Sequence, residues 1–519
     1  MVEKERLELY YDLVIIGAGP GGYHAAIRAA QYGARVALIE KDKLGGTCLN
    51  KGCIPTKALL ASAHHFEKMK HAEEFGIKIK DYKIDFTKVV ERKNRIVNEL
   101  GVGIANLQKS WKNDVYIGQG KILGGNSEKG FEILIQGDNK KDIIIGKRVI
   151  VATGSTPALV PRFNIDHEKI LTSDDILDHN FKSKPKRLLI IGAGVIGCEF
   201  ADIFASFGSK VTLLEYLDSP IATEEPIIIK QLQKKFESKG IEIFTSQNVL
   251  SVENIGLSVK ATTCSALVPM EKIDLADKLT FEADLCLISI GRNKVFKNLG
   301  LEELGIDTKK GIIEVDPKTL ETAVHGIYAI GDVTGGIMLA HVASYEGDIV
   351  VANALSSLGN FNIKPMRTNY RVIPSTIFTN PNIASVGLKR AQAKELGIDV
   401  LVGQFPYESL GKAKCMGEDG LLIILAEKHT LQIVGASCIG ESAPELIAEV
   451  ALAMRNGLSI EKIAHTIHCH PTLSEMVLEA AEATIGKAIH KKGRPISPIL
   501  KDLLLEQIPL ELKKTKSLP

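Results

Sequence analysis

Short apolar segments and glycine-rich turns alternate at the start of the chain. Residues 12–16 predict a buried strand, Gly17–Gly22 predict a tight turn, and residues 23–32 predict a helix. A second apolar strand over residues 35–39 then leads into Glu40. Strand, glycine turn, helix and strand in this order predict the first unit of a parallel α/β sheet.

The same pattern returns later in the chain. Residues 188–191 predict a strand, a turn follows from Gly192 to Gly197, and residues 210–214 predict the next strand, before Glu215. Three pairs of residues share one offset of 175 positions: Gly17 and Gly192, Gly33 and Gly208, and Glu40 and Glu215. Three landmarks at one offset predict two copies of one unit.

Both copies carry residues suited to a dinucleotide. Glycines let the backbone approach a pyrophosphate, and the helix N-terminus donates N–H groups to it. An acidic residue about 20 positions later accepts hydrogen bonds from a ribose. These residues are Gly17, Gly19, Gly22 and Glu40 in the first copy, and Gly192, Gly194, Gly197 and Glu215 in the second. We predict two dinucleotide sites. One working site beside a Rossmann domain without a ligand is less favoured, because both copies keep the glycines and the acid.

Two of the eight cysteines, Cys48 and Cys53, lie five residues apart in the run Gly45–Lys57. This spacing can bring their Cα atoms within the roughly 7 Å that a disulfide needs. Pro55 suits the first turn of a helix, so Cys53 is expected at a helix N-terminus, where the aligned peptides favour a thiolate. A redox cysteine pair with two dinucleotide sites suggests an electron relay of nicotinamide, flavin and disulfide.

Charge and hydropathy exclude some partners. The chain has 519 residues, 64 basic and 62 acidic, without a long basic stripe, so a nucleic acid is a poor partner. No apolar run reaches the roughly 18 residues that a membrane helix needs. The other cysteines are scattered, which fits a reducing compartment. Glu3, Glu5 and Glu8 are unlike a signal or transit peptide. A cytoplasmic protein is therefore expected, with a processed organellar chain as the alternative.

These motifs resemble those of the pyridine nucleotide–disulfide oxidoreductases, and within that family those of the dihydrolipoyl dehydrogenases. The resemblance runs from about Tyr11 to about His490, and its most specific parts are the cysteine run and His468–Glu475. Further matching segments are residues 152–154, 290–292 and 329–332. The resemblance implies an α/β fold with two Rossmann-like dinucleotide-binding domains, for FAD and NAD, and a C-terminal α+β interface domain that forms a homodimer.

The domain organisation that the family implies divides the chain into four parts. These are an FAD-binding domain of residues 1–154 and 289–351, an NAD-binding domain of residues 155–288, an interface domain of residues 352–490, and a C-terminal extension of residues 491–519. Helices are expected near 86–110, 443–456 and 472–485, and strands near 421–426 and 431–438. The extension mixes apolar residues with lysines, which favours a helix packed on the protein's own surface over a segment that docks a partner.

The resemblance also assigns catalytic roles. It implies that Cys53 faces the flavin, that Cys48 exchanges with the substrate, and that His470 is the general base. Glu475 would orient the imidazole of His470, which the family supplies from the partner subunit. A thiol substrate must lose a proton before it attacks a disulfide, and histidine is the usual base for this task.

The remaining site residues follow from the same resemblance. The FAD set is Gly17, Gly19, Gly22, Glu40, Lys57, Thr153, Gly154, Gly331 and Asp332. The NAD set is Gly192, Gly194, Gly197, Glu199, Glu215 and Gly291. Lys57 is expected near the flavin with Glu199 as its partner, and Asp332 on the ribityl chain. A solvated lysine and a simple strand-end turn are the plainer alternatives for Lys57 and Asp332.

The choice of substrate rests on two comparisons. A carboxylate at Glu215 accepts bonds from a free ribose 2′-hydroxyl and repels a 2′-phosphate, so NAD is favoured over NADP. No cysteine follows Cys469, unlike mercuric-type reductases. The expected substrate is dihydrolipoamide on the lipoyl carrier of a 2-oxoacid dehydrogenase complex or of glycine cleavage. The alternative is an NAD(P)H-dependent reductase of another low-molecular-weight disulfide. A non-catalytic assembly subunit would predict damage to the cysteines, His470 or Glu475, and all are intact.

Two details near the C-terminus and one loop depart from the simplest picture. His465, His468, Cys469 and His470 could form a metal site, but Pro471 follows directly and no second ligand cluster is present, so no metal is expected. His468 is expected to be structural and Cys469 to be buried and inert. The family often has another sequence where residues 293–295 follow Gly291, so cofactor affinity could differ there.

Overall fold

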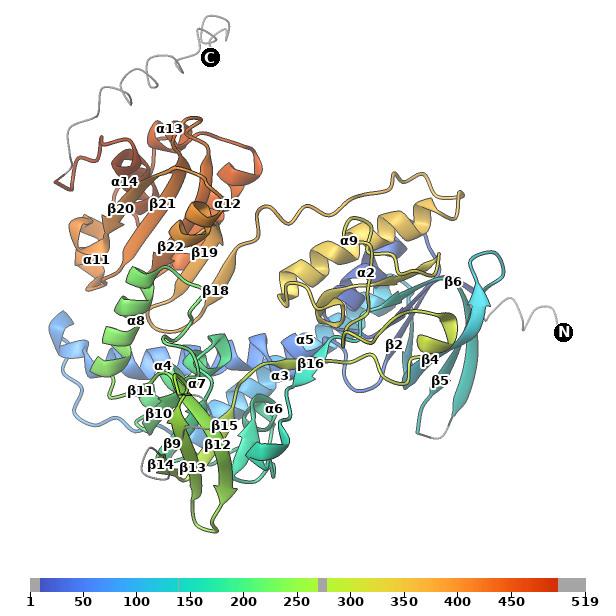
Figure 1. Cartoon of the computed structure of the whole chain (residues 1–519), viewed down its shortest axis with the longest axis horizontal. Helices are drawn as coiled ribbons and strands as arrows, with labels where there is room; N and C mark the ends of the chain where they lie inside the picture. The colour runs from blue at the N-terminus through green and yellow to red at the C-terminus, as the bar shows by residue number, and fades with distance from the viewer. Residues whose placement is uncertain (1–9, 139, 269–277, 493–519) are drawn as a thin grey trace, which may run out of the picture. The chain divides into compact units, whose positions relative to one another are not determined.

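The computed structural model describes residues 10–138, 140–268 and 278–492 (Figure 1). By their contacts, these residues form two compact units. The first contains the chain up to Ser219 together with Lys239–Asn369. The second contains Pro220–Ser238 together with the chain from Tyr370 onward. The C-terminal extension, from residue 493, lies outside the described residues.

A mixed sheet forms the core of the first unit. Its strands, in spatial order, are β3 (Asp114–Ile117), β2 (Val36–Glu40), β1 (Tyr10–Ile16), β6 (Lys141–Val151), β5 (Gly130–Gln136) and β4 (Gln119–Asn126), with β17 (Ile327–Ala329) also paired to β6. Strands β1, β2, β3 and β17 join the sheet by parallel pairing, and β4 and β5 by antiparallel pairing. Because β17 pairs with β6 in the register Ile327 to Val149, the chain returns to this sheet after the second glycine unit.

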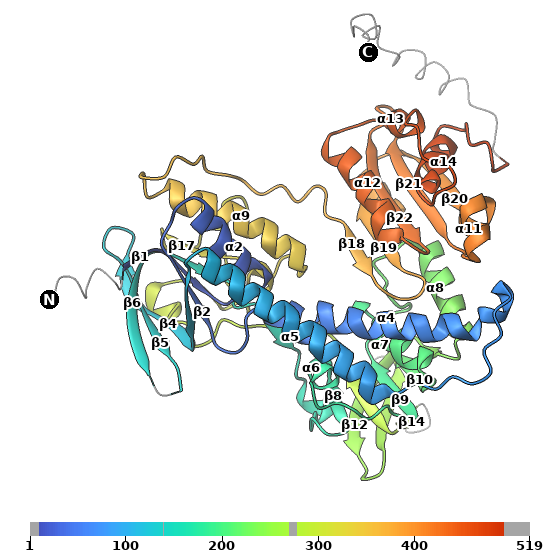
Figure 2. The ribbon, with the colours of Figure 1, turned by 180° about the vertical axis from the view of Figure 1, so that it is seen from behind.

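Strand β1 shows why this sheet is covered on both faces. Leu13 and Ile15 are fully buried in one apolar cluster, and Val14 and Ile16 are buried in another. A strand that is apolar on both faces is typical of a parallel strand inside an α/β sheet. Helices α2 (Pro20–Gln31) and α9 (Ala340–Ser356) lie side by side on one face (Figure 2).

The second glycine unit forms a sheet of its own within the first unit. Its order is β11 (Glu242–Phe244), β10 (Lys210–Leu214), β9 (Arg187–Ile191), β15 (Leu285–Ile288) and β8 (Ile170–Thr172), and every pairing is parallel. Helix α7 (Val195–Ser206) follows β9 directly. The antiparallel strands β12 (Gln247–Asn254), β13 (Val259–Ser265) and β14 (Leu279–Ala283) form a small neighbouring sheet.

Helices form much of the remaining chain of this unit. They are α4 (Cys53–Lys70) and α5 (Phe86–Ser110), with the shorter α3 (Gly46–Lys51) and α6 (Ser173–Leu177). Helix α5 begins where the Asp85 side chain accepts a hydrogen bond from the backbone N–H of Lys88, a typical N-cap. The helix expected near 86–110 is thus confirmed.

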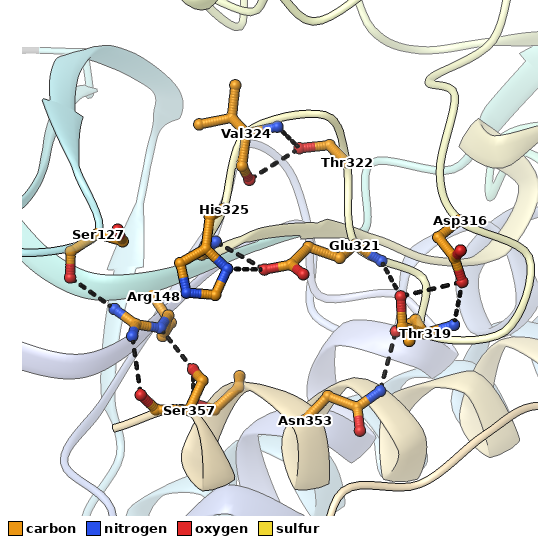
Figure 3. Close-up of polar contacts among 12 residues, drawn as sticks. Ser127, Arg148, Asp316, Thr319, Glu321, Thr322, Val324, His325, Asn353 and Ser357 are labelled. Carbon is orange, nitrogen blue, oxygen red and sulfur yellow. Dashed lines mark hydrogen bonds and ion pairs between the residues drawn. The ribbon is translucent and has the colours of Figure 1, made fainter. Parts of the chain in front are cut away.

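A buried arginine fixes the C-terminus of α9 against the first sheet (Figure 3). Arg148 on β6 donates through Nε to the Ser357 hydroxyl at 2.7 Å and through Nη2 to the Ser357 carbonyl at 3.1 Å. Its Nη1 donates to the Ser127 carbonyl at 2.9 Å. A cation is favourable at a helix C-terminus, where carbonyl groups lack partners within the helix. Burial lowers the pKa of the Arg148 guanidinium from its usual value.

The second unit is an antiparallel sheet with helices packed on it. The strand order is β18 (Ser375–Ile377), β19 (Ile383–Gly387), β22 (Ile433–Ile439), β21 (Leu421–Glu427) and β20 (Val400–Pro406). The helices include α10 (Arg390–Glu395), α11 (Gly411–Met416), α12 (Ala443–Arg455), α13 (Ile460–Ala464) and α14 (Glu475–Thr484). The strands and helices expected between 421 and 485 are confirmed, with α14 beginning three residues later than expected.

Helix α8 (Pro226–Ser238) also belongs to the second unit, where it contacts β22. Two carboxylates just before this helix bind β19 and the segment that follows it. Glu224 accepts a hydrogen bond from Ser385 at 2.9 Å and pairs with Lys389 at 3.1 Å. Glu225, which is almost fully buried, pairs with Arg390 at 2.8 Å. Residues 220–238, which the sequence scheme assigned to the NAD-binding domain, therefore pack with the second unit; the scheme's other boundaries stay predictions.

Among the described residues, no helix is long and apolar enough to cross a membrane.

Candidate active site

The two cysteines lie at the junction of two helices. Cys48 is in α3, and Cys53 is the first residue of α4, with Gly52 between the helices. The Asn50 side chain holds this turn together by donating to the carbonyls of Leu44 and Gly46, each at 3.0 Å. Both cysteines are half-buried thiols, and their sulfur atoms are joined by a hydrogen bond. The expected position of Cys53 at a helix N-terminus is confirmed, while their oxidation to a disulfide stays a prediction.

This arrangement makes the two thiols chemically unequal. The hydrogen bond from the Cys48 thiol and, to a smaller extent, the nearby Lys57 ammonium lower the pKa of Cys53 to about 7, against burial and the charge of Glu199. The same hydrogen bond, together with burial, raises the pKa of Cys48 far above its usual value. Cys53 is therefore the thiol that exists as a thiolate near neutral pH.

Lys57 and Glu199 connect the cysteine helix with the second glycine unit. Lys57 lies one turn after Cys53 on α4, and Glu199 lies on α7. The Lys57 ammonium donates to both carboxylate oxygens of Glu199, each at 2.9 Å. The Glu199 side chain is 5% exposed and the Lys57 side chain 31% exposed. The predicted pair is thus present, on the two helices expected for it.

In the first glycine turn, three glycines serve two different needs. Gly17 has a φ of +103°, and a Cβ on Gly22 would lie 1.8 Å from the Gly17 carbonyl oxygen, so no side chain fits there. A Cβ on Gly19 would meet only the Gly46 Cα, at 4.0 Å. The chain's own packing leaves space in front of Gly19, at the N-terminus of α2, where a pyrophosphate needs it.

The second glycine turn repeats this geometry. Gly192 has a φ of +99°, and a Cβ on Gly197 would lie 1.9 Å from the Gly192 carbonyl oxygen. A Cβ on Gly194 would meet nothing within 4 Å. Both turns therefore fit a dinucleotide by the same test: the backbone is exposed at the middle glycine and tightly packed at the outer two.

The two acidic residues also match each other. Glu40 accepts from the Ala18 N–H at 2.8 Å and from the Asp42 N–H at 2.9 Å. Glu215 accepts from the Ala193 N–H at 2.5 Å and from the Leu217 N–H at 2.9 Å. Each carboxylate is thus held at the end of its strand beside its glycine turn, where the fingerprint places the residue that binds a ribose.

Asp332, from the predicted FAD set, belongs to a cluster of hydrogen bonds around Ser155. Its hydroxyl donates to Asp332, while Arg292 donates to the same hydroxyl at 2.8 Å and to the Ser155 carbonyl at 2.9 Å. Thr47, next to Cys48, also donates to this carbonyl at 3.3 Å. Sequence reasoning missed Ser155 as the contact that joins these segments, because nothing in its local sequence shows partners that lie far along the chain.

The turns beside this cluster contain Thr153, Gly154, Gly291 and Gly331. Thr153 donates from its hydroxyl to the Val295 carbonyl. Gly154, Gly291 and Gly331 have φ values of +69°, +134° and +72°, which L-residues with side chains rarely adopt. The Gly331 N–H donates to Glu346 at 2.7 Å, a buried carboxylate of α9 that the sequence did not single out.

The histidine and glutamate of the predicted base lie in the second unit. His470 Nδ1 and Glu475 Oε1 are 2.8 Å apart, and Glu475 also accepts from the Thr472 N–H at 2.9 Å. Although burial acts in the opposite direction, these bonds lower the pKa of Glu475. The His470 side chain is 78% exposed, so its Nε2 edge is open to a substrate. The cysteines, in contrast, belong to the first unit.

The residues around His468 differ in their contacts and in their exposure. Among the residues that the structure describes, no group of three or more histidine, cysteine or acidic side chains could hold a metal ion. His468 binds the Glu449 carboxylate and the Thr466 carbonyl, each at 2.9 Å, in the structural role expected of it. Cys469 is exposed, so the expectation of a buried cysteine was wrong. It lies in the loop between α13 and α14.

Comparison with known proteins agrees with this geometry. Residues 11–347 match the family described as pyridine nucleotide-disulphide oxidoreductase, and residues 373–481 match the dimerisation domain of the same family. The chain belongs to the pyridine nucleotide-disulphide oxidoreductases. The predicted fold class is confirmed, and so are FAD and NAD as the cofactors of this kind of protein.

Relatives within the family include two named dihydrolipoyl dehydrogenase. The Bacillus subtilis (strain 168) protein is 41% identical over 485 residues, covering 92% of this chain and 99% of the relative. The Chlamydia muridarum protein is 40% identical over 484 residues, covering 92% of this chain and 98% of the relative.

Solved structures of the family are similar as well. LpdA from Mycobacterium tuberculosis has a TM-score of 0.82 and 27% identity, covering 91% of this chain and 98% of that one. RclA from Escherichia coli, described as an HOCl-induced flavoprotein disulfide reductase, has a TM-score of 0.77 and 29% identity, covering 90% of this chain and 98% of that one.

Proposed function

We propose that this oxidoreductase is a dihydrolipoyl dehydrogenase, which oxidises dihydrolipoamide to lipoamide and reduces NAD. The observation that carries the proposal is the pair of unequal thiols, Cys48 and Cys53, beside the Lys57–Glu199 ion pair and between two dinucleotide turns. Relatives that are about 40% identical over 92% of the chain and bear this name support it.

The thiol chemistry assigns a different task to each cysteine. With the pair oxidised, a substrate thiolate attacks Cys48 Sγ, breaks the Cys48–Cys53 bond and leaves Cys53 as a thiolate. The second substrate thiolate then attacks the substrate sulfur of this mixed disulfide, which releases the Cys48 thiolate and lipoamide. Two electrons pass from the substrate to the cysteine pair. Bound FAD would accept these electrons and NAD would take them as a hydride equivalent.

The proton balance of this step requires a base. Each substrate thiol loses one proton, and His470 would accept the first at Nε2 while Glu475 holds Nδ1. Of the two protons, one would leave with the two electrons as the hydride equivalent and the other would pass to water. The carboxylate stabilises the imidazolium that forms, since its own pKa is lowered and it stays ionised. We further propose that the protein is a homodimer and that His470 acts on the cysteines of the partner subunit, which is consistent with the match of residues 373–481 to a dimerisation domain.

Cofactor binding would follow the two turns. Gly17, Gly19, Gly22 and Glu40 would hold the adenosine part of FAD, and the second turn with Glu215 would hold NAD. By the same reasoning, the further residues that would bind FAD are Lys57, Thr153, Gly154, Gly331 and Asp332. Those that would bind NAD are Glu199 and Gly291. We also propose that the protein acts in the cytoplasm, on the lipoyl carrier of a 2-oxoacid dehydrogenase complex or of glycine cleavage.

A second candidate is a reductase of another disulfide. The likeness to RclA favours it, because that protein is described as a flavoprotein disulfide reductase. In such an enzyme the electrons would run in the opposite direction, from a reduced nicotinamide to a disulfide substrate at Cys48. The two candidates therefore differ in donor, acceptor and direction, and not in the cysteine chemistry.

Steady-state assays of the purified holoenzyme separate the two. NAD reduction by dihydrolipoamide is measured beside NADP reduction, and beside glutathione disulfide with NADH and with NADPH. Rapid turnover with dihydrolipoamide and NAD alone supports the proposal. A flavin-loaded protein that is inactive with dihydrolipoamide but reduces another disulfide would replace it with the second candidate.

A further inference from the structure

Helices α4 and α7 pack against each other (Figure 2). Between them, a row of charged and polar side chains extends beyond Lys57 and Glu199. On α7 the row consists of Glu199, Asp202 and Ser206, which share one face of the helix by their spacing. On α4 it consists of Lys57, His64, Glu67 and Lys70. Lys239 joins the row from the chain that follows α8. We call this row the α4–α7 seam.

At the centre of the seam, one lysine binds a carboxylate from each helix. The Lys239 ammonium lies 2.6 Å from Asp202 on α7 and 2.8 Å from Glu67 on α4. Asp202 is fully buried, and the Lys239 and Glu67 side chains are 11% and 13% exposed. Charges this far from water interact strongly and are costly to separate, so this bridge resists any shift between the helices.

Further contacts lengthen the bridge along the two helices. His64 Nε2 lies 3.4 Å from the second oxygen of Asp202. The Ser206 hydroxyl donates to Glu67 at 3.1 Å, and the Lys70 ammonium donates to the Ser206 carbonyl at 3.0 Å. The seam thus runs along α4 from Lys57 to Lys70 and along α7 from Glu199 to Ser206.

The seam affects the distances of Lys57 and Glu199 from Cys53 to different extents. Lys57 is on the same helix as Cys53, one turn away, so helix geometry fixes their spacing. Glu199 is on α7, so its distance from Cys53 depends on how α7 lies against α4. We propose that the α4–α7 seam is a positioning element, in which Asp202 and Lys239 hold Glu199 at a fixed distance from Cys53. This goes beyond the Lys57–Glu199 pair itself and rests on the proposed role of Cys53 as a reactive thiol.

The direction of the effect follows from the charges. Glu199 is negative and opposes the thiolate, whereas Lys57 is positive and favours it. If the seam is loosened, Glu199 can move away, and Lys57 stays beside Cys53 with less of its charge neutralised. The Cys53 thiolate should then form at lower pH, although no group in contact with Cys53 has been changed.

Asp202→Asn tests this proposal, because it keeps the size of the side chain and removes its charge. The rate of alkylation of Cys53 by iodoacetamide is followed against pH in the flavin-loaded Cys48→Ser protein, with peptide mass spectrometry to distinguish Cys53 from the exposed Cys415 and Cys469. We expect the pKa of Cys53 to fall by about half a unit, which is about a threefold gain in thiolate at pH values below it. Lys239→Arg, which keeps the cation, should give the pKa of the parent protein.

Two controls separate positioning from loss of stability. Lys93 is a buried lysine of α5 that binds the carbonyls of Leu177 and Asp178, outside the seam. Lys93→Gln should lower the melting temperature and leave the pKa of Cys53 unchanged. In a Glu199→Gln background, Asp202→Asn should cause no further shift, because the charge that the seam positions is already absent.

The outcomes distinguish this proposal from the proposed function. If Cys53 in the parent protein does not titrate near neutral pH, the proposed role of the thiol pair is wrong. If it does, and Asp202→Asn lowers the melting temperature as Lys93→Gln does without changing the titration, then the seam is structural only. A shift that persists in the Glu199→Gln background would also overturn the positioning role.

Discussion

The Lys57 ammonium donates a hydrogen bond to each oxygen of the Glu199 carboxylate at 2.9 Å, and Lys57 lies one helical turn from Cys53. The two charges act on the Cys53 thiolate in opposite directions, and they modify a pKa that the hydrogen bond from Cys48 does most to lower, to about 7. The pair therefore affects thiol chemistry and also joins the cysteine helix to the helix of the second glycine turn.

Removing one charge at a time should shift this balance both ways. Glu199→Gln removes a negative charge and should lower the pKa of Cys53, so that the thiolate persists to lower pH. Lys57→Gln should raise it, so that the thiolate is lost at higher pH. The measurement is alkylation of Cys53 against pH in the Cys48→Ser background, where a serine hydroxyl still lies beside the sulfur. Shifts of the same sign in both variants would contradict the assignment.

Cys48→Ser should separate catalysis from cofactor binding. Without Cys48 no disulfide can form, so turnover with dihydrolipoamide should fall to background. The glycine turns and Asp332 are untouched, so the protein should remain yellow with a full complement of flavin. Absorbance spectra and turnover are measured on the same preparation, with Cys415→Ser as a control that should keep both. Loss of flavin in Cys48→Ser would show that the two sites are not separate.

His470→Gln should lower kcat with dihydrolipoamide by about 100-fold or more, the usual contribution of a general base. Glu475→Gln should cause a smaller loss, since it removes the orienting carboxylate and leaves the base. The pKa of Glu475 lies below its usual value, so the carboxylate stays ionised and the pH dependence of kcat in the neutral range should not arise from it. His465→Gln, at an exposed position five residues earlier, is the matched control and should leave the pH profile unchanged.

Glu215→Arg should exchange the preferred nicotinamide cofactor. The carboxylate that we propose binds a ribose is replaced by a cation that can pair with a 2′-phosphate, so KM for NAD should rise and KM for NADP should fall. Initial rates with each cofactor at saturating dihydrolipoamide give the ratio. The corresponding change in the first turn, Glu40→Arg, should instead reduce flavin content. Unchanged preference in Glu215→Arg would remove the basis for assigning NAD to this turn.

Arg148→Met should destabilise the first unit without touching the thiols. The buried guanidinium donates to Ser357 and Ser127, and its loss leaves their carbonyls without a charged donor. The free energy of unfolding should fall by about 2 to 3 kcal/mol, as expected for hydrogen bonds to a charged group. Urea denaturation measures this change, and the alkylation profile of Cys53 should be that of the unchanged protein. A stability within error of the parent would show that the network in Figure 3 contributes little.

Local patterns explain what the sequence could predict. The two glycine turns were found from their spacing, and they adopt the same backbone, with φ values of +103° at Gly17 and +99° at Gly192. Helix α5 has the expected bounds because the residues that form its N-cap and its apolar face lie close together in the sequence. The fold class follows from such units, since strands separated by helices must pair in parallel.

Contacts between distant segments explain what could not be predicted. Ser155 joins Thr47, Arg292 and Asp332, and Lys239 joins Glu67 and Asp202, yet no periodicity links these positions. The exposure of Cys469 depends on how its loop packs, which the residues next to it in the sequence do not reveal. The place of α8 was missed for the same reason, because Glu224 and Glu225 find their partners more than 150 residues further along the chain.

The path of the chain through α8 limits how the protein can be divided. A fragment that ended at Asn369 would keep Glu224 and Glu225 but lose Ser385, Lys389 and Arg390. The fragment would then contain two carboxylates without the cations, Lys389 and Arg390, that neutralise them in the whole chain. Neither unit is a single stretch of sequence, so truncation cannot yield an autonomous dinucleotide-binding module. A protease that cut the chain at one site between the units would leave the two pieces held together.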